Sequence, residues 1–276
     1  TTEPIEKNNP LLNAKNILLS PHLGASTREA KEGVSKAICE QVRDYLLDQK
    51  FTNALNMPIS NLSLLNDLKP YLDLGEMLGD LMSQLNKESI NQVIIECKGN
   101  IEDIRPISLA TLKGILSPNL PDRVNYINAE AIAKELGINI EIGYSNMDSN
   151  YNNLISLKVL TENNTFRLDG SIFDDLKPRL VNVLGRDMEV TPKGAMLFIE
   201  NVDVPGVIGR VGTLLGNRDI NIAAYLLSRE NQNGKAFAVI RIDNSIKVED
   251  ITELRKLKEV EKVQYIRVNT WFLIIF

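Results

Sequence analysis

The last third of the chain carries the pattern that most restricts its fold. From residue 195 onward, the apolar residues alternate between the spacing of a strand and that of a helix. We expect strands over 195–200, 220–228, 235–243 and 260–268, and helices over 205–216 and 248–257. We expect Pro205 at the start of the first of these helices, where its missing N–H group has no intrahelical partner to lose. The order strand, helix, strand, strand, helix, strand predicts a ferredoxin-like βαββαβ fold.

Composition and charge restrict the functions open to the chain. Its 276 residues exceed the ~150 residues of an average domain, so we expect about two domains. The 31 Lys and Arg and the 36 Asp and Glu residues give a net charge of −5 without a basic block, which argues against nucleic-acid binding. The two cysteines, Cys39 and Cys97, exclude a disulfide framework, a four-cysteine zinc site and a cysteine-ligated iron–sulfur cluster within this chain. We expect no metal site.

No segment has the pattern of a membrane span or a targeting signal. The longest apolar runs fall short of the ~18 residues that a span needs, so we expect a cytoplasmic protein with no membrane partner. The chain opens at Thr1 without an initiator methionine, which leads us to expect further sequence upstream. The six apolar residues 271–276 predict either a buried strand or an aggregation-prone tail.

The first segment contains the only histidine of the protein, His22. Residues 16–20 form an apolar run that predicts a buried strand ended by Pro21, which places His22 in a loop at the carboxyl end of that strand. Ligands of open α/β sheets bind at such loops, and imidazole both takes and gives a proton near neutral pH. A turn residue beside a proline is the other interpretation of His22, and the residues alone leave both open.

Residues 26–29 predict a capping box that starts a helix ending near residue 48.

Three strings in residues 1–57 carry a resemblance to a known family: Thr-Thr-Glu-Pro, Asn-Ile-Leu-Leu-Ser-Pro-His-Leu-Gly-Ala-Ser-Thr and Asn-Ala-Leu-Asn-Met. They resemble the closing stretch of the catalytic half of the D-3-phosphoglycerate dehydrogenases, which belong to the D-2-hydroxyacid dehydrogenases. The resemblance implies that His22 is the general acid/base for the substrate hydroxyl, that Glu3 pairs with it, and that His22 and Gly24 lie near the nicotinamide of NAD. It also implies 3-phosphoglycerate as substrate, in L-serine biosynthesis.

Two parts that this family uses are missing from the sequence. No Gly-x-Gly-x-x-Gly spacing for a dinucleotide occurs, and no arginine matches the one that holds the substrate carboxylate. We therefore expect the chain to correspond to the carboxyl-terminal part of such an enzyme and to bind NAD weakly on its own.

The middle of the chain, residues 54–190, predicts an α+β domain. We expect a helix with Pro70 in its first turn, further helices over 106–116 and 128–136, and strands over 90–97, 138–144, 153–162, 165–170 and 180–184. Position and pattern resemble the intervening, allosteric substrate-binding domain of the longer dehydrogenases. That resemblance implies an anion site formed by Arg179, Arg186 and Arg241. Without it, three separate arginines are more simply surface charges.

The string Asn201-Val-Asp203-Val-Pro205-Gly206, followed fifteen residues after Gly206 by Asn221-Ile-Ala-Ala, resembles an ACT domain, a regulatory module that binds amino acids. Asp203 offers an anionic acceptor, Asn221 a donor and an acceptor, and the helix start offers free N–H groups. The resemblance implies that Asn201, Asp203 and Asn221 contact L-serine across a pair of such domains in a homo-oligomer. Asn201 replaces a tyrosine or histidine of other members, and turn chemistry is the alternative role for Asp203 and Asn221.

These observations predict a chain of mixed α/β and α+β class. Its expected parts are the end of a split catalytic, Rossmann-type region (1–53), an intervening α+β domain (54–190), a ferredoxin-like ACT domain (194–268) and an apolar tail (269–276). The leading hypothesis is the carboxyl-terminal part of an NAD-dependent D-3-phosphoglycerate dehydrogenase with serine regulation. A non-catalytic amino-acid-sensing module is the alternative, and two lone cysteines disfavour an iron–sulfur serine dehydratase.

Overall fold

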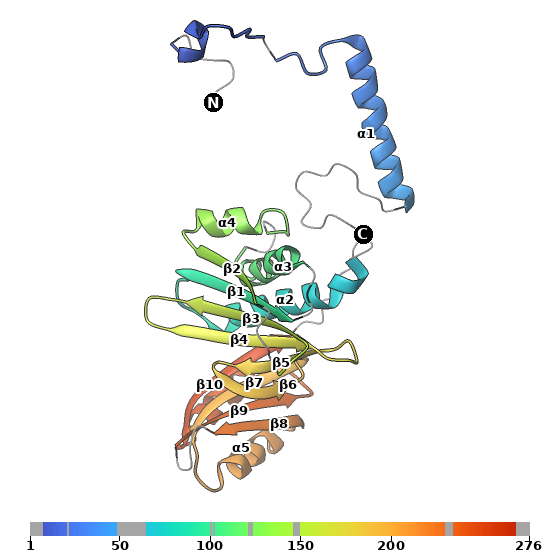
Figure 1. Ribbon diagram of the computed structural model, residues 1–276. Coiled ribbons are helices and arrows are strands. Elements are labelled where there is room, and N and C mark those ends of the chain that lie inside the picture. The colour runs from blue at the N-terminus through green and yellow to red at the C-terminus, as the bar shows by residue number, and fades with distance from the viewer. Residues whose placement is uncertain are drawn as a thin grey trace. The chain divides into compact units, whose positions relative to one another are not determined.

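The computed structural model of the chain describes residues 8–20, 22–48, 65–99, 101, 103–120, 124–145, 150–229 and 234–268 (Figure 1). The chain divides into two compact units, Thr1–Leu55 and Asn56–Phe276, which are described separately. Among the described residues, no helix has the length and apolar character to cross a bilayer, and no group of histidine, cysteine and carboxylate side chains is arranged to hold a metal ion. Glu3 and the apolar run 271–276 lie outside the described residues.

The first unit contains a short 3-10 helix, Pro10–Asn13, and a long helix α1, Arg28–Asp48. The prediction of a strand over 16–20 is wrong, because these residues form no strand or helix and Asn16 has a φ of 63°. A strand needs a neighbour to pair its backbone N–H and C=O groups, and the described part of this unit contains no second strand.

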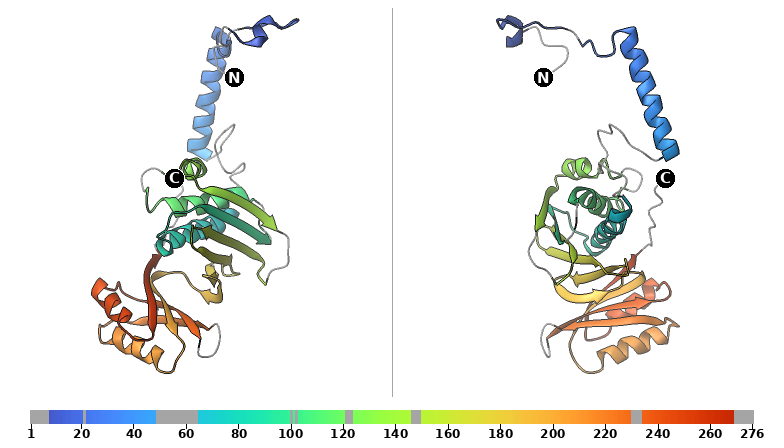
Figure 2. Two further views of the ribbon diagram at one scale, coloured as in Figure 1. Left: turned by 90° about the vertical axis from the view of Figure 1, so that its left-hand side faces the viewer. Right: turned by 45° about the vertical axis from the view of Figure 1, so that its right-hand side comes forward.

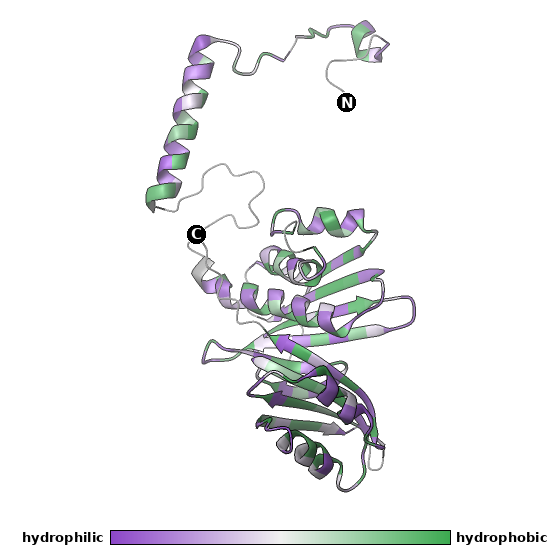
Figure 3. Ribbon diagram, turned by 180° about the vertical axis from the view of Figure 1, so that it is seen from behind, coloured by the Kyte–Doolittle hydropathy of each residue, from purple (hydrophilic) through white to green (hydrophobic). Residues whose placement is uncertain are grey.

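The helix α1 begins one residue later than its capping signal suggests. The hydroxyl of Thr27, not that of Ser26, accepts a hydrogen bond from the N–H group of Ala30 at 3.2 Å. The third helical residue is then Ala30, whose methyl group cannot accept a hydrogen bond from the N–H group of the N-cap residue. The expected capping box is therefore reduced to the single hydrogen bond of Thr27. Polar and apolar residues both line α1 (Figure 3), and within this unit Val34 and Ile38 are more than half exposed.

A six-stranded sheet forms the first part of the second unit, with strand order β2-β1-β3-β4-β5-β6. The pair β1–β2 is parallel and the remaining pairs are antiparallel. The elements are α2 (Leu65–Leu85), β1 (Gln92–Gly99), α3 (Ile104–Leu116), α4 (Ala129–Glu135), β2 (Asn139–Ser145), β3 (Asn153–Leu160), β4 (Thr165–Ile172), β5 (Pro178–Val183) and β6 (Arg186–Val190). The predicted α+β class is confirmed.

Helices α2 and α3 cover the same face of this sheet (Figure 2) and fill the main core with Leu78, Leu81 and Ile107. Pro70 was expected in the first turn of α2, but the helix begins at Leu65 and Pro70 lies inside it. The ring removes one intrahelical hydrogen bond there, a cost that the buried apolar face of α2 outweighs.

The second part of the unit is a four-stranded antiparallel sheet with order β10-β7-β9-β8. Its elements are β7 (Gly194–Val202), α5 (Val207–Gly216), β8 (Ile222–Arg229), β9 (Lys235–Ile242), α6 (Val248–Arg255) and β10 (Val260–Val268). The predicted βαββαβ order is therefore confirmed. Leu197, Ile199 and Ile240 on one face of the sheet pack with Val211 and Leu215 of α5 in a separate core.

The opposite face of the four-stranded sheet joins the core of the six-stranded sheet. Phe198 and Phe237, both at most 2% exposed, meet edge to face with 5.7 Å between ring centroids, and the guanidinium of Arg186 lies 4.9 Å over the Phe237 ring. Gln84 of α2 accepts from the N–H and donates to the C=O of Arg267 in β10, each at 2.9 Å. The two sheets thus share one core, and α2 caps the outer edge of β10 at this point.

Candidate functional site

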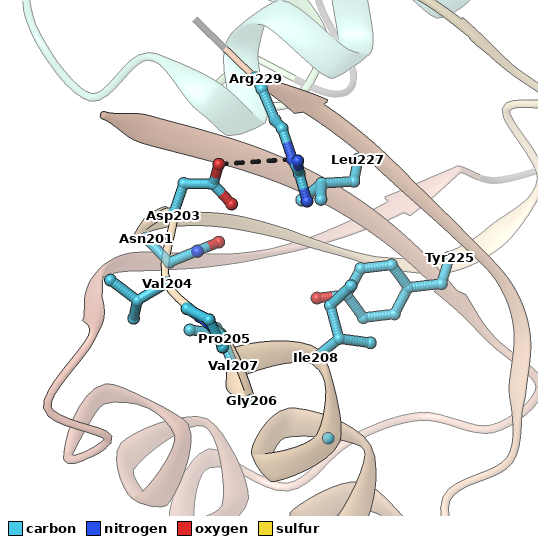
Figure 4. Close-up of a pocket in the computed structure, with 11 residues that line it drawn as sticks. Asn201, Asp203, Val204, Pro205, Gly206, Val207, Ile208, Tyr225, Leu227 and Arg229 are labelled. Atoms are coloured by element: carbon cyan, nitrogen blue, oxygen red, sulfur yellow. Dashed lines mark ion pairs between the residues drawn. The ribbon is translucent and has the colours of Figure 1, made fainter. Parts of the chain in front are cut away.

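A pocket of about 380 Å³ lies where the end of β7, the start of α5 and the end of β8 meet (Figure 4). β7 leads directly into α5 through the turn at Pro205-Gly206, so residues close in sequence form one side of the pocket. The lining residues are Asn201, Asp203, Val204, Pro205, Gly206, Val207, Ile208, Gly209, Tyr225, Leu227 and Arg229.

The start of α5 supplies hydrogen-bond donors to this pocket. Gly206 is the N-cap residue with a φ of 90°, a left-handed conformation that glycine adopts without strain, and no side chain caps the helix. A Cβ atom at this position would also lie 2.8 Å from the guanidinium Nη1 of Arg210. The first N–H groups of an α-helix have no intrahelical acceptor and carry a partial positive charge, so this end of the pocket favours an anionic group.

Two acceptors face those donors. The side chain of Asp203 is 13% exposed, and its Oδ2 lies 3.4 Å from Nε of Arg229. Asn201 is 3% exposed; its Nδ2 donates to the backbone carbonyl of Val202 at 2.8 Å, which fixes the orientation of the amide. The Oδ1 of Asn201 is then buried without a hydrogen-bond partner, and the amide points into the pocket (Figure 4). A buried acceptor without a donor destabilises the protein by about 1–3 kcal/mol, which a ligand that donates to it would offset.

The remaining wall comes from β8. Tyr225, Leu227 and Arg229 alternate along the strand and therefore point to the same face of the sheet. The hydroxyl of Tyr225 is directed into the pocket (Figure 4). Burial raises the pKa of Tyr225, so its hydroxyl keeps its proton at neutral pH and remains both a donor and an acceptor.

The structure brings two of the three predicted effector contacts into this pocket. Asn201 and Asp203 line it, whereas Asn221 does not; its amide Nδ2 donates to Oδ2 of Asp243 at 2.5 Å. Tyr225 and Arg229 are pocket residues that the sequence analysis did not propose. The alternation of Tyr225 and Leu227 in the strand expected over 220–228 indicates that they share a face, but this signal stops short of Arg229 and does not place the strand beside Asp203.

The three arginines of the predicted anion site lie on different strands of the structure. Arg179 in β5 pairs with Asp175 at 3.2 Å and lies 5.6 Å over the Phe173 ring. Arg186 begins β6 and stacks on Phe237. Its strand partner Val183 lies four positions beyond Arg179, which is about 13 Å at a strand rise of ~3.3 Å per residue. Arg241 lies in β9, and the anion site stays a prediction.

The predicted catalytic histidine, His22, lies in an exposed loop of the first unit. The carbonyl of Leu23 accepts from the N–H group of Ser26 at 3.2 Å, which closes a turn after the histidine. A Cβ atom at Gly24 would lie 3.1 Å from Nε2 of His22, so glycine lets the ring lie close to the backbone. The expected pairing of His22 with Glu3 is not tested, because Glu3 lies outside the described residues.

Comparison with known proteins finds a family model and several relatives that match this chain. Residues 67–184 match the family model described as the D-3-phosphoglycerate dehydrogenase intervening domain. The chain is 32% identical over 260 residues to the D-3-phosphoglycerate dehydrogenase of Bacillus subtilis and 34% identical over 262 residues to that of Methanocaldococcus jannaschii. Each alignment covers 94% of this chain and 50% of the relative, so the chain spans about half the length of the curated relatives it matches.

Among solved structures, the ACT domain from GTP pyrophosphokinase of Chlorobium tepidum is similar to 27% of this chain and to 97% of that one. The sequence identity is 21% and the TM-score is 0.22. By sequence, residues 67–184 match the D-3-phosphoglycerate dehydrogenase intervening-domain family, and 94% of the chain is similar to about half of each of these two D-3-phosphoglycerate dehydrogenases.

Proposed function

We propose that the chain is the regulatory and closing catalytic part of an NAD-dependent D-3-phosphoglycerate dehydrogenase, located in the cytoplasm. The enzyme would oxidise 3-phosphoglycerate to 3-phosphohydroxypyruvate in L-serine biosynthesis. We assign residues 1–53 to the end of the catalytic region, 54–190 to the intervening domain, 194–268 to the regulatory module and 269–276 to its tail. The homology to half of each dehydrogenase relative supports this assignment.

The regulatory proposal depends on one observation: two acceptors and a helix start face each other across the same pocket. An α-amino acid has an ammonium group that needs acceptors and a carboxylate that needs donors. Asp203 and the partnerless Oδ1 of Asn201 suit the ammonium group, and the first turn of α5 suits the carboxylate. Tyr225 can meet a side-chain hydroxyl, which makes L-serine the effector that we propose.

A pairing of two regulatory modules is part of the same proposal. β8 is an end strand of its sheet, and among the described residues no strand pairs with its outer edge. The other end strand, β10, is capped by Gln84 at Arg267. An open strand edge favours pairing with another strand, so β8 supports a homo-oligomer formed through this module. Asn221 precedes β8 directly, which would place it close to such an interface.

The catalytic part of the proposal assigns His22 as the base that accepts the proton of the substrate hydroxyl. Glu3 would hold the other ring nitrogen, and Gly24 would let the nicotinamide of NAD approach the loop. NAD would supply the hydride acceptor. Glycine at position 24 lets the His22 ring lie close to the loop backbone, since a Cβ atom there would be 3.1 Å from Nε2, and this supports assigning the loop to the nicotinamide end of the cofactor. We further propose that Arg179, Arg186 and Arg241 attract anions in the intervening region.

Titration calorimetry of the 276-residue chain with L-serine tests the regulatory proposal. We expect measurable binding, and we expect Asp203→Asn to weaken it about 10- to 100-fold, because a hydrogen bond to a charged group contributes about 1.5–3 kcal/mol. The matched control is Glu261→Gln, which removes an exposed carboxylate of the same module that pairs with Lys235. Serine binding that survives Asp203→Asn unchanged would refute the assignment of the pocket.

The alternative, a sensing module without catalysis, makes a different prediction for the longer protein. Coding sequence in frame with this chain that contains a Gly-x-Gly-x-x-Gly loop supports the dehydrogenase. Its absence from the complete reading frame would favour the sensing module, and serine binding by the pocket would be retained in both cases.

A further inference from the structure

The pocket contains a charged residue that the proposed function does not use, Arg229. It is the last residue of β8, and its side chain is 57% exposed. The contact with Asp203 runs through Nε at 3.4 Å, while the terminal end of the guanidinium extends past Asp203 into the pocket (Figure 4). Arginine has five N–H donors in a planar fork, so an ion pair made through Nε leaves its terminal amino groups able to bind a second anion.

The electrostatic balance of the pocket depends on this residue. Among the described residues that line the pocket, Asp203 and Arg229 are the only two whose side chains carry a formal charge, and these two charges cancel. A neutral pair of opposite charges matches a zwitterion, which has one charge of each sign. Without Arg229, the pocket would keep only the negative charge of Asp203 and would favour a simple ammonium ion.

We propose that Arg229 binds the carboxylate of the effector and so makes the pocket specific for zwitterionic α-amino acids over simple amines. This inference rests on the proposed function of the pocket and adds its specificity-determining residue. Asp203 has two roles in it: it accepts from the ammonium group of the ligand and orients the Arg229 guanidinium. The two oxygens of a carboxylate have enough lone pairs to accept both from Arg229 and from the first turn of α5.

Three ligands test separately the part of the pocket that binds the ammonium group and the part that binds the carboxylate. L-serine carries both charges, ethanolamine is serine without its carboxylate, and 3-hydroxypropanoate is serine without its ammonium group. We expect the wild-type chain to bind L-serine about 10- to 100-fold more tightly than either of the others, the range of one hydrogen bond to a charged group.

The key variant is Arg229→Gln, which removes the charge and keeps much of the side-chain length. We expect it to weaken L-serine binding about 10- to 100-fold and to leave ethanolamine binding unchanged or stronger, so that the preference for serine disappears. Arg229→Lys should restore part of the serine affinity, because it returns the charge without the planar fork. Titration calorimetry at one ionic strength measures all of these affinities.

The matched control is Arg218→Gln. Arg218 belongs to the same module and also pairs through Nε with a shielded carboxylate, Asp250, at 3.2 Å, but it does not line the pocket. Its substitution should leave all three affinities unchanged.

Equal losses of serine and ethanolamine binding in Arg229→Gln would show a merely structural role and overturn the inference, as would an unchanged serine affinity. Loss of serine binding in Asp203→Asn but not in Arg229→Gln would overturn this inference alone, whereas a wild-type chain that binds no serine would overturn the proposed function as well.

Discussion

Replacing His22 with alanine in a complete dehydrogenase, with the half that this chain does not span supplied, is expected to lower kcat/KM for 3-phosphoglycerate about 10²–10⁴-fold. In the proposed mechanism, His22 accepts the proton of the C2 hydroxyl while the hydride leaves C2 for NAD. The loop that holds His22 is exposed, and the ring lies against the backbone of Gly24, so its loss creates no cavity in a core. Initial rates of NADH formation measure the change.

Two further variants give this prediction its controls. Lys31→Ala changes an exposed cation in the first turns of α1 and should leave the rate within about twofold. NAD affinity of His22→Ala, measured by calorimetry, should stay close to that of the unchanged enzyme, because the imidazole acts on the substrate hydroxyl. A His22→Ala enzyme with undiminished turnover would remove this residue from the mechanism and leave the homology to dehydrogenases as ancestry only.

The ferredoxin-like order of residues 194–268 was predictable because each of its elements has a local signal. Three of its strands contain apolar runs, at 195–199, 222–227 and 236–240, and Pro205-Gly206 marks the start of α5. The strand β6, Arg186–Val190, was missed because only Val190 in it is buried. It forms because Leu184 and Gly185, with φ values of 53° and 85°, make a two-residue hairpin turn between β5 and β6. Leucine is an uncommon residue at such a turn, so the sequence carried no recognisable signal.

The two sides of the pocket also differ in whether a local sequence signal marks them. Asn201 and Asp203 could be proposed from sequence because they lie next to the helix start at Pro205-Gly206. Tyr225 and Arg229 come from β8, which is separated from β7 by β9 in the sheet, so only the strand order brings them to the pocket. The strand was also expected to end at residue 228, one residue before Arg229. Strand order depends on long-range pairing, which periodicity does not reveal.

The contact between α2 and α3 leads to the second large prediction, which concerns stability. A Cβ atom on Gly114 would lie 2.1 Å from the carbonyl oxygen of Glu76 and 2.9 Å from the backbone nitrogen of Asp80. A Cβ atom on Gly79 would meet the backbone of α3 in the same way, 2.2 Å from the carbonyl oxygen of Thr111. The two helices therefore touch backbone to backbone, and neither clash can be relieved by turning a side chain.

We expect Gly114→Ala to lower the free energy of unfolding by about 3 kcal/mol or more, at the upper end of the range for overpacked cores. The substitution must separate α2 from α3, and it then also disturbs the ion pair between Lys113 and Glu76, whose atoms are 2.6 Å apart. This loss exceeds the gain of about 1 kcal/mol that alanine brings over glycine inside a helix. Urea unfolding followed by circular dichroism measures the difference.

Two comparisons decide whether the helix contact causes this loss. Gly212→Ala in α5 is the matched control, because a Cβ atom there meets nothing within 4 Å, and it should raise stability by up to about 1 kcal/mol. The double variant Gly79→Ala, Gly114→Ala should lose less than the sum of the single losses, because helices already separated by one methyl group have room for the second. A stable Gly114→Ala, or losses that add in full, would mean that α2 and α3 do not meet through these two glycines.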